Sequence, residues 1–231
     1  MANAIIMASG LGSRMRPLTE RTPKPLIKVH GVPMIESVLN ALERAGVEKI
    51  FVVAGYLKEQ FAYLTDKYPN VSIIENPDYL TVNNISSIYY AREALLEGDT
   101  FICEADLFVK NQDLFSNRSN GSCYFGKFVK GDSADWVFDT DSNGFITRVG
   151  KVGKDRYNMV GISYFTGADA KTLSERIAAA YGKEGYETLF WDDVVNANLS
   201  VLRLTVAPVD KDDIYEIDTV EELNEINGAN T

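Results

Sequence analysis

The chain has 231 residues and an ordinary globular composition, with 45% hydrophobic and 24% charged residues. Its net charge is −10, and because the field of such a chain repels nucleic acid and anionic membrane surfaces, neither is expected as a partner. No apolar run approaches the roughly 20 residues that a membrane span needs, and no charged segment precedes the first apolar run. We therefore expect a cytoplasmic protein without a signal peptide or membrane anchor.

Histidine and cysteine are too scarce for several kinds of site. A single histidine, His30, excludes a metal site built from several histidines and makes a Ser-His-Asp triad improbable. Two cysteines, Cys103 and Cys123, cannot form a disulfide framework, and Cys103 lies in an apolar run typical of a buried thiol.

Apolar, strand-like runs alternate with helix-like segments through the first half of the chain. The expected strands are residues 4–8, 49–56, 71–76 and 100–106, and the expected helices are residues 37–46, 58–68 and 86–96. This alternation predicts an α/β fold with a Rossmann-like, mostly parallel sheet and helices on both faces. Ligands of such sheets bind beyond the carboxyl ends of the strands.

The second half of the chain has a different texture. Short β-like runs and turns at 123–129, 134–150 and 158–165 predict a small antiparallel lid or insertion, followed by helices at 168–182 and near 191–196, a strand at 201–209 and a closing acidic helix. The string DTDSNG resembles the start of a calcium loop. Gly150 stands where that loop needs a bidentate glutamate, so a hairpin turn is the better interpretation.

Directly after the first apolar run, residues 9–35 read SGLGSRMRPLTERTPKPLIKVHGVPMI. Gly10 and Gly12 allow backbone N–H groups to approach an anion, because glycine has no Cβ and tolerates positive φ. Arg14, Arg16 and Lys24 supply the positive charge that a polyphosphate needs. The alternative is a simple tight turn with solvated cations, which would not need a lysine held between two prolines.

Two common phosphate motifs do not fit this segment. The P-loop string Gly-x4-Gly-Lys-Ser/Thr is absent, and Met15 occupies the place of the third glycine of the dinucleotide fingerprint. The string GxGxRxRPLT followed by PKPL instead resembles the signature of the nucleotidyltransferases that activate sugar phosphates and alcohol phosphates. The resemblance continues densely through residues 31–61.

Later strings resemble the bacterial phosphocholine cytidylyltransferases. They are NPDYLTVNNISSIYYAREAL, EADLFVKN and YEIDTVEEL. The resemblance implies a single nucleotidyltransferase domain over residues 1–231. Within it, residues 1–118 would form the nucleotide-binding half, about 119–205 the acceptor-binding insertion, and 206–231 the return to a metal site.

The resemblance also assigns catalytic roles. Lys24 should contact the phosphates and Arg14 should stabilise the leaving pyrophosphate, while Asp106 and Asp218 should hold Mg²⁺. Either acid could instead cap a helix. The expected nucleotide contacts are Ala8, Gly10, Leu11, Gly12, Arg14, Lys24, Asn84, Ser86, Ser87 and Glu104. Ser86 and Ser87 could equally cap the helix that they begin.

Two tryptophans indicate the chemistry of the acceptor. Trp136 and Trp191 are the only tryptophans of the chain, and each stands beside a carboxylate, Asp135 and Asp192. Aromatic faces with an acid nearby suit a quaternary ammonium, although both tryptophans could simply pack in the core. The expected acceptor contacts are Asp135, Trp136, Lys154, Gly161, Trp191, Asp192 and Glu216. For Lys154 a solvated loop is the equal alternative.

These features predict a Mg²⁺-dependent cytidylyltransferase that transfers CMP from CTP to phosphocholine, giving CDP-choline and pyrophosphate. The near alternative is transfer to 2-aminoethylphosphonate or phosphoethanolamine, because the extra acid Asp193 suits the N–H donors of a primary ammonium. A sugar-1-phosphate nucleotidyltransferase is more distant, since the lid offers few side chains for sugar hydroxyls. The sequence leaves open the oligomeric state, with a homodimer as one alternative, the pathway, and the preference for CTP over UTP.

Overall fold

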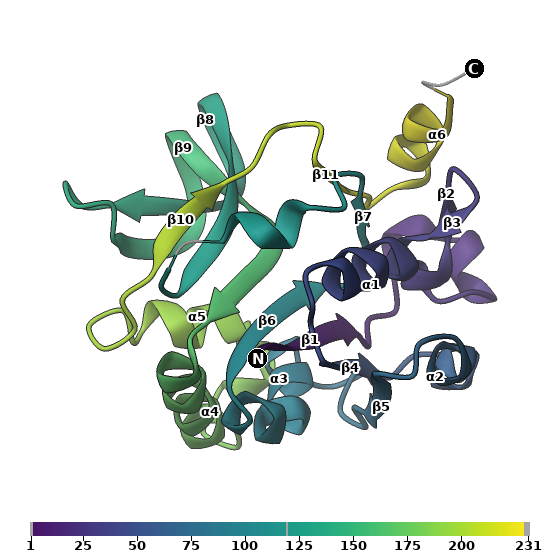
Figure 1. Ribbon diagram of the computed structural model, residues 1–231, viewed down its shortest axis with the longest axis horizontal. Coiled ribbons are helices and arrows are strands. Elements are labelled where there is room, and N and C mark those ends of the chain that lie inside the picture. The colour runs from purple at the N-terminus through teal and green to yellow at the C-terminus, as the bar shows by residue number, and fades with distance from the viewer. Residues whose placement is uncertain (1, 119, 229–231) are drawn as a thin grey trace.

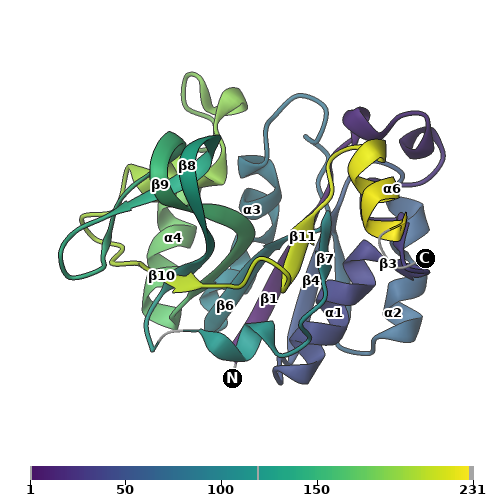
Figure 2. The ribbon, with the colours of Figure 1, turned by 90° about the horizontal axis from the view of Figure 1, so that it is seen from above.

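The computed structural model describes residues 2–118 and 120–228; residues 1, 119 and 229–231 of the expected domain ranges lie outside the described residues. A seven-stranded sheet with the order β10-β8-β9-β6-β1-β4-β5 runs through the molecule (Figures 1 and 2). Its parallel part consists of β1 (Ala2–Ala8), β4 (Lys49–Ala54), β5 (Val71–Glu75) and β6 (Asp99–Glu104). The predicted α/β class is confirmed.

Helices cover both faces of the sheet, and successive side chains of β1 point to these opposite faces. Ile6 packs in a core with α1 (Met34–Arg44) and α2 (Tyr63–Lys67). The adjacent Ile5 packs in a second core with α3 (Ile85–Ala91), α4 (Gly167–Ala180) and α5 (Trp191–Asn196). Two of the predicted helices are shorter than expected, since residues 58–61 and 92–96 form 3₁₀ turns.

The antiparallel half consists of two long strands rather than several short ones. β8 (Cys123–Thr140) and β9 (Ile146–Phe165) pair along an irregular register with several bulges, and β9 also pairs antiparallel with β6. Asp141 closes the hairpin turn by accepting hydrogen bonds from the backbone N–H groups of Asn143 and Phe145. The hairpin interpretation therefore holds. The expected strand at 201–209 shortens to β10 (Thr205–Pro208), which pairs with β8.

Short strands bring the end of the chain back to the sheet. β7 (Leu107–Val109) follows β6 and pairs antiparallel with β11 (Ile214–Glu216), and α6 (Val220–Gly228) follows β11. A small hairpin of β2 (Lys28–Val29) and β3 (Val32–Pro33) precedes α1.

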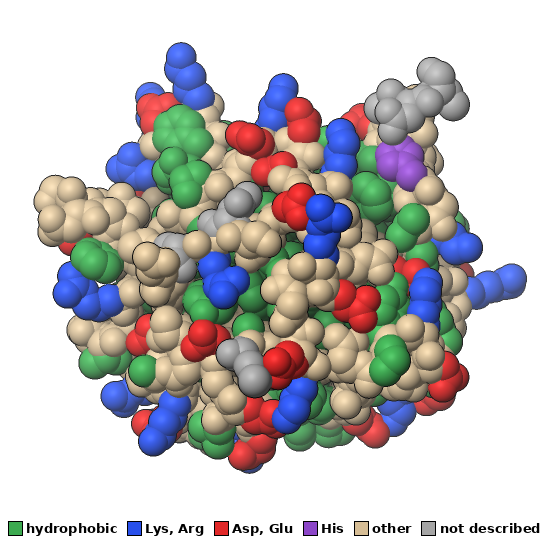
Figure 3. Space-filling view, in the orientation of Figure 1, with side chains coloured by type: hydrophobic (Ala, Val, Ile, Leu, Met, Phe, Trp, Pro, Cys, Tyr) green, Lys and Arg blue, Asp and Glu red, His purple; other side chains and the backbone are tan. Residues whose placement is uncertain are grey.

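The charges on the surface and the lengths of the helices agree with what the composition predicts for a globular protein. In the face shown in Figure 3, basic side chains are interspersed with acidic ones. No helix within residues 2–118 and 120–228 is both long and apolar enough to cross a membrane. Cys103 and Cys123 are buried, and in the described part of the chain neither forms a disulfide.

Candidate active site

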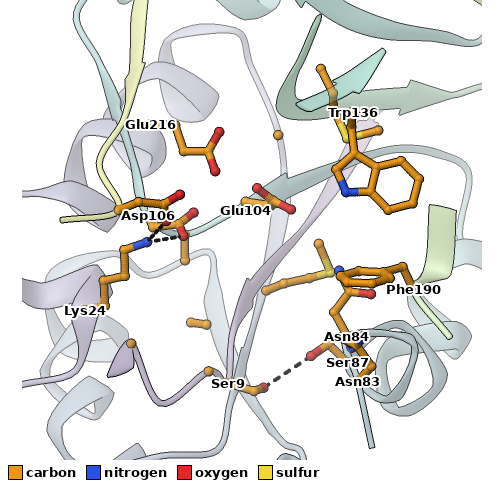
Figure 4. A pocket seen from close by; sticks show the side chains of 18 of the residues that line it. Ser9, Lys24, Asn83, Asn84, Ser87, Glu104, Asp106, Trp136, Phe190 and Glu216 are labelled. Atoms are coloured by element: carbon orange, nitrogen blue, oxygen red, sulfur yellow. Dashed lines mark hydrogen bonds and ion pairs between the residues drawn. The ribbon is translucent and has the colours of Figure 1, made fainter. Parts of the chain in front are cut away.

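A cavity of about 850 Å³ opens at the carboxyl ends of β1 and β6. The loop after β1 and the start of α3 line one side of it, and the β8–β9 pair lines another. The end of β11 completes the wall. Figure 4 shows Lys24 and Asp106 on one side of Glu104, and Trp136 and Phe190 on the other.

The loop after β1 is shaped by close contact between Gly12 and Lys24. Gly12 has a φ of 61°, and a Cβ built on it would lie 2.8 Å from Lys24 Cβ. The Thr19 hydroxyl donates a hydrogen bond of 2.9 Å to the Gly12 carbonyl oxygen. Gly10 faces open space, since a Cβ there would have no neighbour within 4 Å. The loop therefore presents bare backbone to the cavity and packs its other side against Lys24.

Lys24 bridges two carboxylates that lie far apart in the sequence. Its Nζ lies 2.6 Å from Asp106 Oδ2 (Figure 4) and 2.6 Å from Asp218 Oδ1. A guanidinium nitrogen of Arg14 lies 2.7 Å from the same oxygen of Asp218. The Lys24 side chain is only 8% exposed, whereas that of Arg14 is 67% exposed. Two cationic and two anionic side chains thus meet beside the glycine loop.

The pairing of β7 with β11 explains why Asp106 and Asp218 meet. Asp106 directly precedes β7, Asp218 follows β11, and Leu107 pairs with Glu216 across the two strands. Thr219 caps α6, since its hydroxyl accepts a hydrogen bond from Glu222 N. The Asp218 carboxylate is not that cap and points to Lys24.

Three carboxylates form a group that could hold a metal ion. Asp106, Glu216 and Asp218 each offer an oxygen, and these oxygens lie within 4.8 Å of one another. The second oxygen of Asp106, Oδ1, is buried without a hydrogen-bond partner. Oxygen-rich, partly exposed groups of this kind match the ligands that hard divalent cations prefer.

Small polar side chains line the wall below the glycine loop. The Asn76 amide donates to the hydroxyls of Ser86, at 2.9 Å, and Ser87, at 3.3 Å. The Ser87 hydroxyl lies 3.4 Å from that of Ser9 in the loop. Neither serine caps α3. This network makes that wall of the cavity polar, and we call it the polar floor.

The opposite wall is aromatic. The rings of Trp136 and Phe190 meet edge to face with centroids 5.4 Å apart. The Lys151 ammonium lies 5.6 Å from the Trp136 ring centroid and 5.4 Å from that of Phe190. Asp135 and Asn158 line the same end of the cavity.

Comparison with known proteins identifies the family. The model of the MobA-like NTP transferase domain matches residues 4–117. A 2-aminoethylphosphonate cytidylyltransferase of Lancefieldella rimae is 57% identical over 96% of this chain and 90% of its own length. A choline-phosphate cytidylyltransferase of Streptococcus pneumoniae is 32% identical over 96% of both chains. The chain belongs to the cytidylyltransferases of this nucleotidyltransferase family.

The solved structure of a relative supports the same family assignment. The CTP:phosphocholine cytidylyltransferase of Streptococcus pneumoniae superposes with a TM-score of 0.91 at 30% identity, covering 100% of this chain and 99% of that one. The predicted nucleotidyltransferase fold is confirmed.

Charge is concentrated around the carboxylates of the cytidylyltransferase. Burial, followed by the charges of Asp106 and Glu216, raises the pKa of Glu104 well above its usual value. Desolvation within the cavity, with the charges of Asp106 and Asp218, raises the pKa of Glu216 to about 7. Burial alone would lower the pKa of Lys24, but the two bridged carboxylates outweigh it and raise that pKa. The cavity therefore favours additional positive charge.

Most of the predicted site residues of the cytidylyltransferase line this one cavity. They are Ala8, Gly10, Gly12, Arg14, Lys24, Asn84, Ser86, Ser87, Glu104, Asp106, Asp135, Trp136, Gly161, Glu216 and Asp218. Four do not line it, namely Leu11, Lys154, Trp191 and Asp192.

The expected pair of tryptophans does not form. Trp191 is 3% exposed and packs against Tyr124 and Phe165 in the core below α4 and α5. Asp192 is equally buried and accepts a hydrogen bond from the Tyr124 hydroxyl. The first turn of α5 directs both side chains inward, and Phe190, just before it, takes the place beside Trp136.

Sequence reasoning missed several cavity residues. They are Asn76, Lys127, Lys151, Asn158 and Phe190. Phe190 directly precedes Trp191 in the sequence, so its aromatic side chain could have been predicted as an acceptor contact. Lys127 and Lys151 carried none, because an isolated lysine in a strand is typical of a solvated surface.

Proposed function

We propose that this cytidylyltransferase transfers CMP from CTP to 2-aminoethylphosphonate and releases pyrophosphate. The observation that carries the choice of acceptor is the 57% identity, over nearly the full length, to a 2-aminoethylphosphonate cytidylyltransferase, against 32% to a choline-phosphate cytidylyltransferase. Among the sequence-based expectations, phosphocholine stood first and 2-aminoethylphosphonate second; the comparisons support the reverse order.

The two substrates would meet at the carboxylates. CTP would lie along the glycine loop and the serines of α3, within residues 1–118, with its base on the polar floor. The acceptor would enter from residues 119–205, past Trp136 and Asp135. Residues 206–231 would then contribute Glu216 and Asp218 at the junction of the two sites.

A magnesium ion fits the three-carboxylate group. Asp106 and Asp218 would hold it, with Glu216 within reach, and the unpartnered Oδ1 of Asp106 offers a further oxygen. When bound, Mg²⁺ neutralises phosphate charge and helps to align the triphosphate. Lys24 would have to leave the carboxylates to make room, and the α-phosphate gives its ammonium a new anionic partner.

The reaction proposed is direct in-line attack of a phosphonate oxygen on the α-phosphorus of CTP. Lys24 would follow the α-phosphate as negative charge spreads over its oxygens, and Arg14 would stabilise the departing pyrophosphate. The attacking oxygen is ionised near neutral pH, so no side chain has to remove a proton. No covalent enzyme intermediate is needed.

The carboxylate of Asp135 at the acceptor end suits an amine. Asp135 is exposed within the cavity, and among the described residues it forms no ion pair with lysine or arginine. A primary ammonium offers three N–H donors, which a carboxylate accepts.

Release of pyrophosphate from CTP tests the proposal. With Mg²⁺, we expect rapid release with 2-aminoethylphosphonate and slower release with phosphoethanolamine, phosphocholine or glucose-1-phosphate.

Asp106→Asn should lose at least about 10²-fold in kcat while keeping its fold, because it removes a carboxylate from the charge-neutralising group. Efficient release with phosphocholine and none with 2-aminoethylphosphonate would contradict the proposed acceptor, and full activity of Asp106→Asn would contradict the site.

A further inference from the structure

Lys151 occupies the aromatic wall of the cavity with a positive charge of its own. It stands directly opposite Trp136 in the register of β8 and β9, which explains why its ammonium lies over the Trp136 ring. The same ammonium also lies over Phe190. The Arg148 guanidinium donates to the carbonyl oxygens of Lys151 and Val152, at 3.2 and 3.1 Å, and holds the backbone of this bend.

A trimethylated ammonium and a primary ammonium would use this wall differently. The trimethylated group has no N–H to donate, so aromatic faces are its best partners. At Trp136 and Phe190 it would have to displace the Lys151 ammonium or lie close to it, and like charges at that distance repel. A primary ammonium does not need the rings, because carboxylates accept its hydrogen bonds.

Asp135 is held in place where it could accept hydrogen bonds from a primary ammonium. The Asn158 amide donates to Asp135 Oδ2 at 3.2 Å and to the Ser133 hydroxyl at 2.7 Å. A carboxylate can only accept, which fixes the orientation of the amide. Asp135 is thus oriented by a neutral donor, and among the described residues it forms no ion pair with a lysine or arginine.

We propose that Lys151 determines acceptor specificity by filling the aromatic subsite of Trp136 and Phe190, so that the enzyme takes a primary amine at Asp135 and rejects a trimethylated one. This inference rests on the proposed function, since it concerns the acceptor end of the same cavity. Lys151 acts here as a built-in competitor of the quaternary ammonium.

The test compares two acceptors in matched variants. Lys151→Met keeps the length of the side chain and removes the charge, Lys151→Arg keeps the charge, and Lys130→Met changes an exposed lysine of β8 outside the cavity. We expect Lys151→Met to raise kcat/KM for phosphocholine relative to 2-aminoethylphosphonate by about tenfold, mainly through a lower KM for phosphocholine. Lys151→Arg and Lys130→Met should leave the ratio unchanged.

Two results would overturn the inference. One is an unchanged ratio in Lys151→Met, and the other is a parallel loss with both acceptors, which would make Lys151 a general phosphate-binding cation.

A binding measurement separates this inference from the proposed function. If the unchanged enzyme accepts no phosphorylated or phosphonate amine, the proposed function fails. Choline binding, followed by the fluorescence of Trp136, then tests Lys151 alone: Lys151→Met should bind choline about tenfold more tightly than the unchanged enzyme. Equal affinity would overturn the inference.

Discussion

At the scale of single residues, Lys24 is the centre of the site. Its ammonium lies where a metal held by Asp106 and Asp218 would lie, and it neutralises both carboxylates in the protein without ligands. The lysine and a divalent cation therefore compete for the same oxygens. In the proposed reaction, nucleotide would resolve this competition by giving the ammonium its phosphates as new partners.

Replacement of Lys24 by Met should separate the two roles of this residue. Without nucleotide, Lys24→Met should bind Mn²⁺ at least about tenfold more tightly, because the competing cation is gone. Its kcat should fall by about 10²–10³-fold, because charge on the α-phosphate loses its partner. Electron paramagnetic resonance of free Mn²⁺ measures the first effect. Lys49→Met, which removes an exposed ion pair with Glu97, is the control. Unchanged Mn²⁺ affinity in Lys24→Met would refute the competition.

Asp192 should make stability depend on pH. Burial raises its pKa to about 7, above the value of about 3.8 expected in the unfolded chain. The folded state thus holds the proton more tightly. The contribution of this proton to the free energy of unfolding is complete below about pH 4 and is lost as the pH rises through 7.

Asp192→Asn should remove this dependence, since its amide oxygen can still accept the hydrogen bond from Tyr124. Relative to that variant, the unchanged protein should lose about 4 kcal/mol of unfolding free energy between pH 4 and pH 8. Urea unfolding at both pH values measures the difference. A constant difference would mean that Asp192 is not buried as described.

At the scale of elements, β9 shapes the cavity through Gly161. This residue has a φ of 73°, and a Cβ built on it would lie 2.9 Å from Glu104 Oε2. The positive φ favours glycine at this position, and an added Cβ would push the Glu104 side chain aside.

Gly161→Ala should lower unfolding free energy by about 1–2 kcal/mol and lower kcat by displacing Glu104. Gly182→Ala is a matched control, because Gly182 has a φ of 81° but no atom within 4 Å of its added Cβ. It should lose comparable backbone stability and keep its kcat. If both variants lose activity equally, the contact with Glu104 has no role.

The same elements explain what the sequence could predict. The chemistry of Gly10, Gly12 and Lys24 is local, and strand ends such as Asp106 follow from alternating apolar runs, so these residues could be identified. Lys151 and Lys154 could not be told apart. Val152 and Asp155 adopt positive φ and bend the strand around them, so Lys151 meets the cavity and Lys154 does not. That bend depends on long-range pairing with β8, and the burial of Trp191 depends on long-range packing against Tyr124 and Phe165.

At the scale of the whole molecule, one sheet joins the two proposed substrate sites. Its parallel half ends beside the glycine loop and the polar floor, and its antiparallel half carries Trp136 (Figure 4) and Asp135. The return of the chain through β11 adds Glu216 and Asp218 at the boundary. The proposed transfer between two anionic substrates would thus take place where segments far apart in the sequence meet.

The most direct test of the account is a competition followed by ³¹P nuclear magnetic resonance. The enzyme is given CTP, Mg²⁺ and equal concentrations of 2-aminoethylphosphonate and phosphocholine. We predict that the phosphonate resonance is consumed first and is replaced by a coupled phosphonate–phosphate pair, with release of pyrophosphate. Consumption of phosphocholine ahead of the phosphonate, or of neither acceptor, would contradict the account.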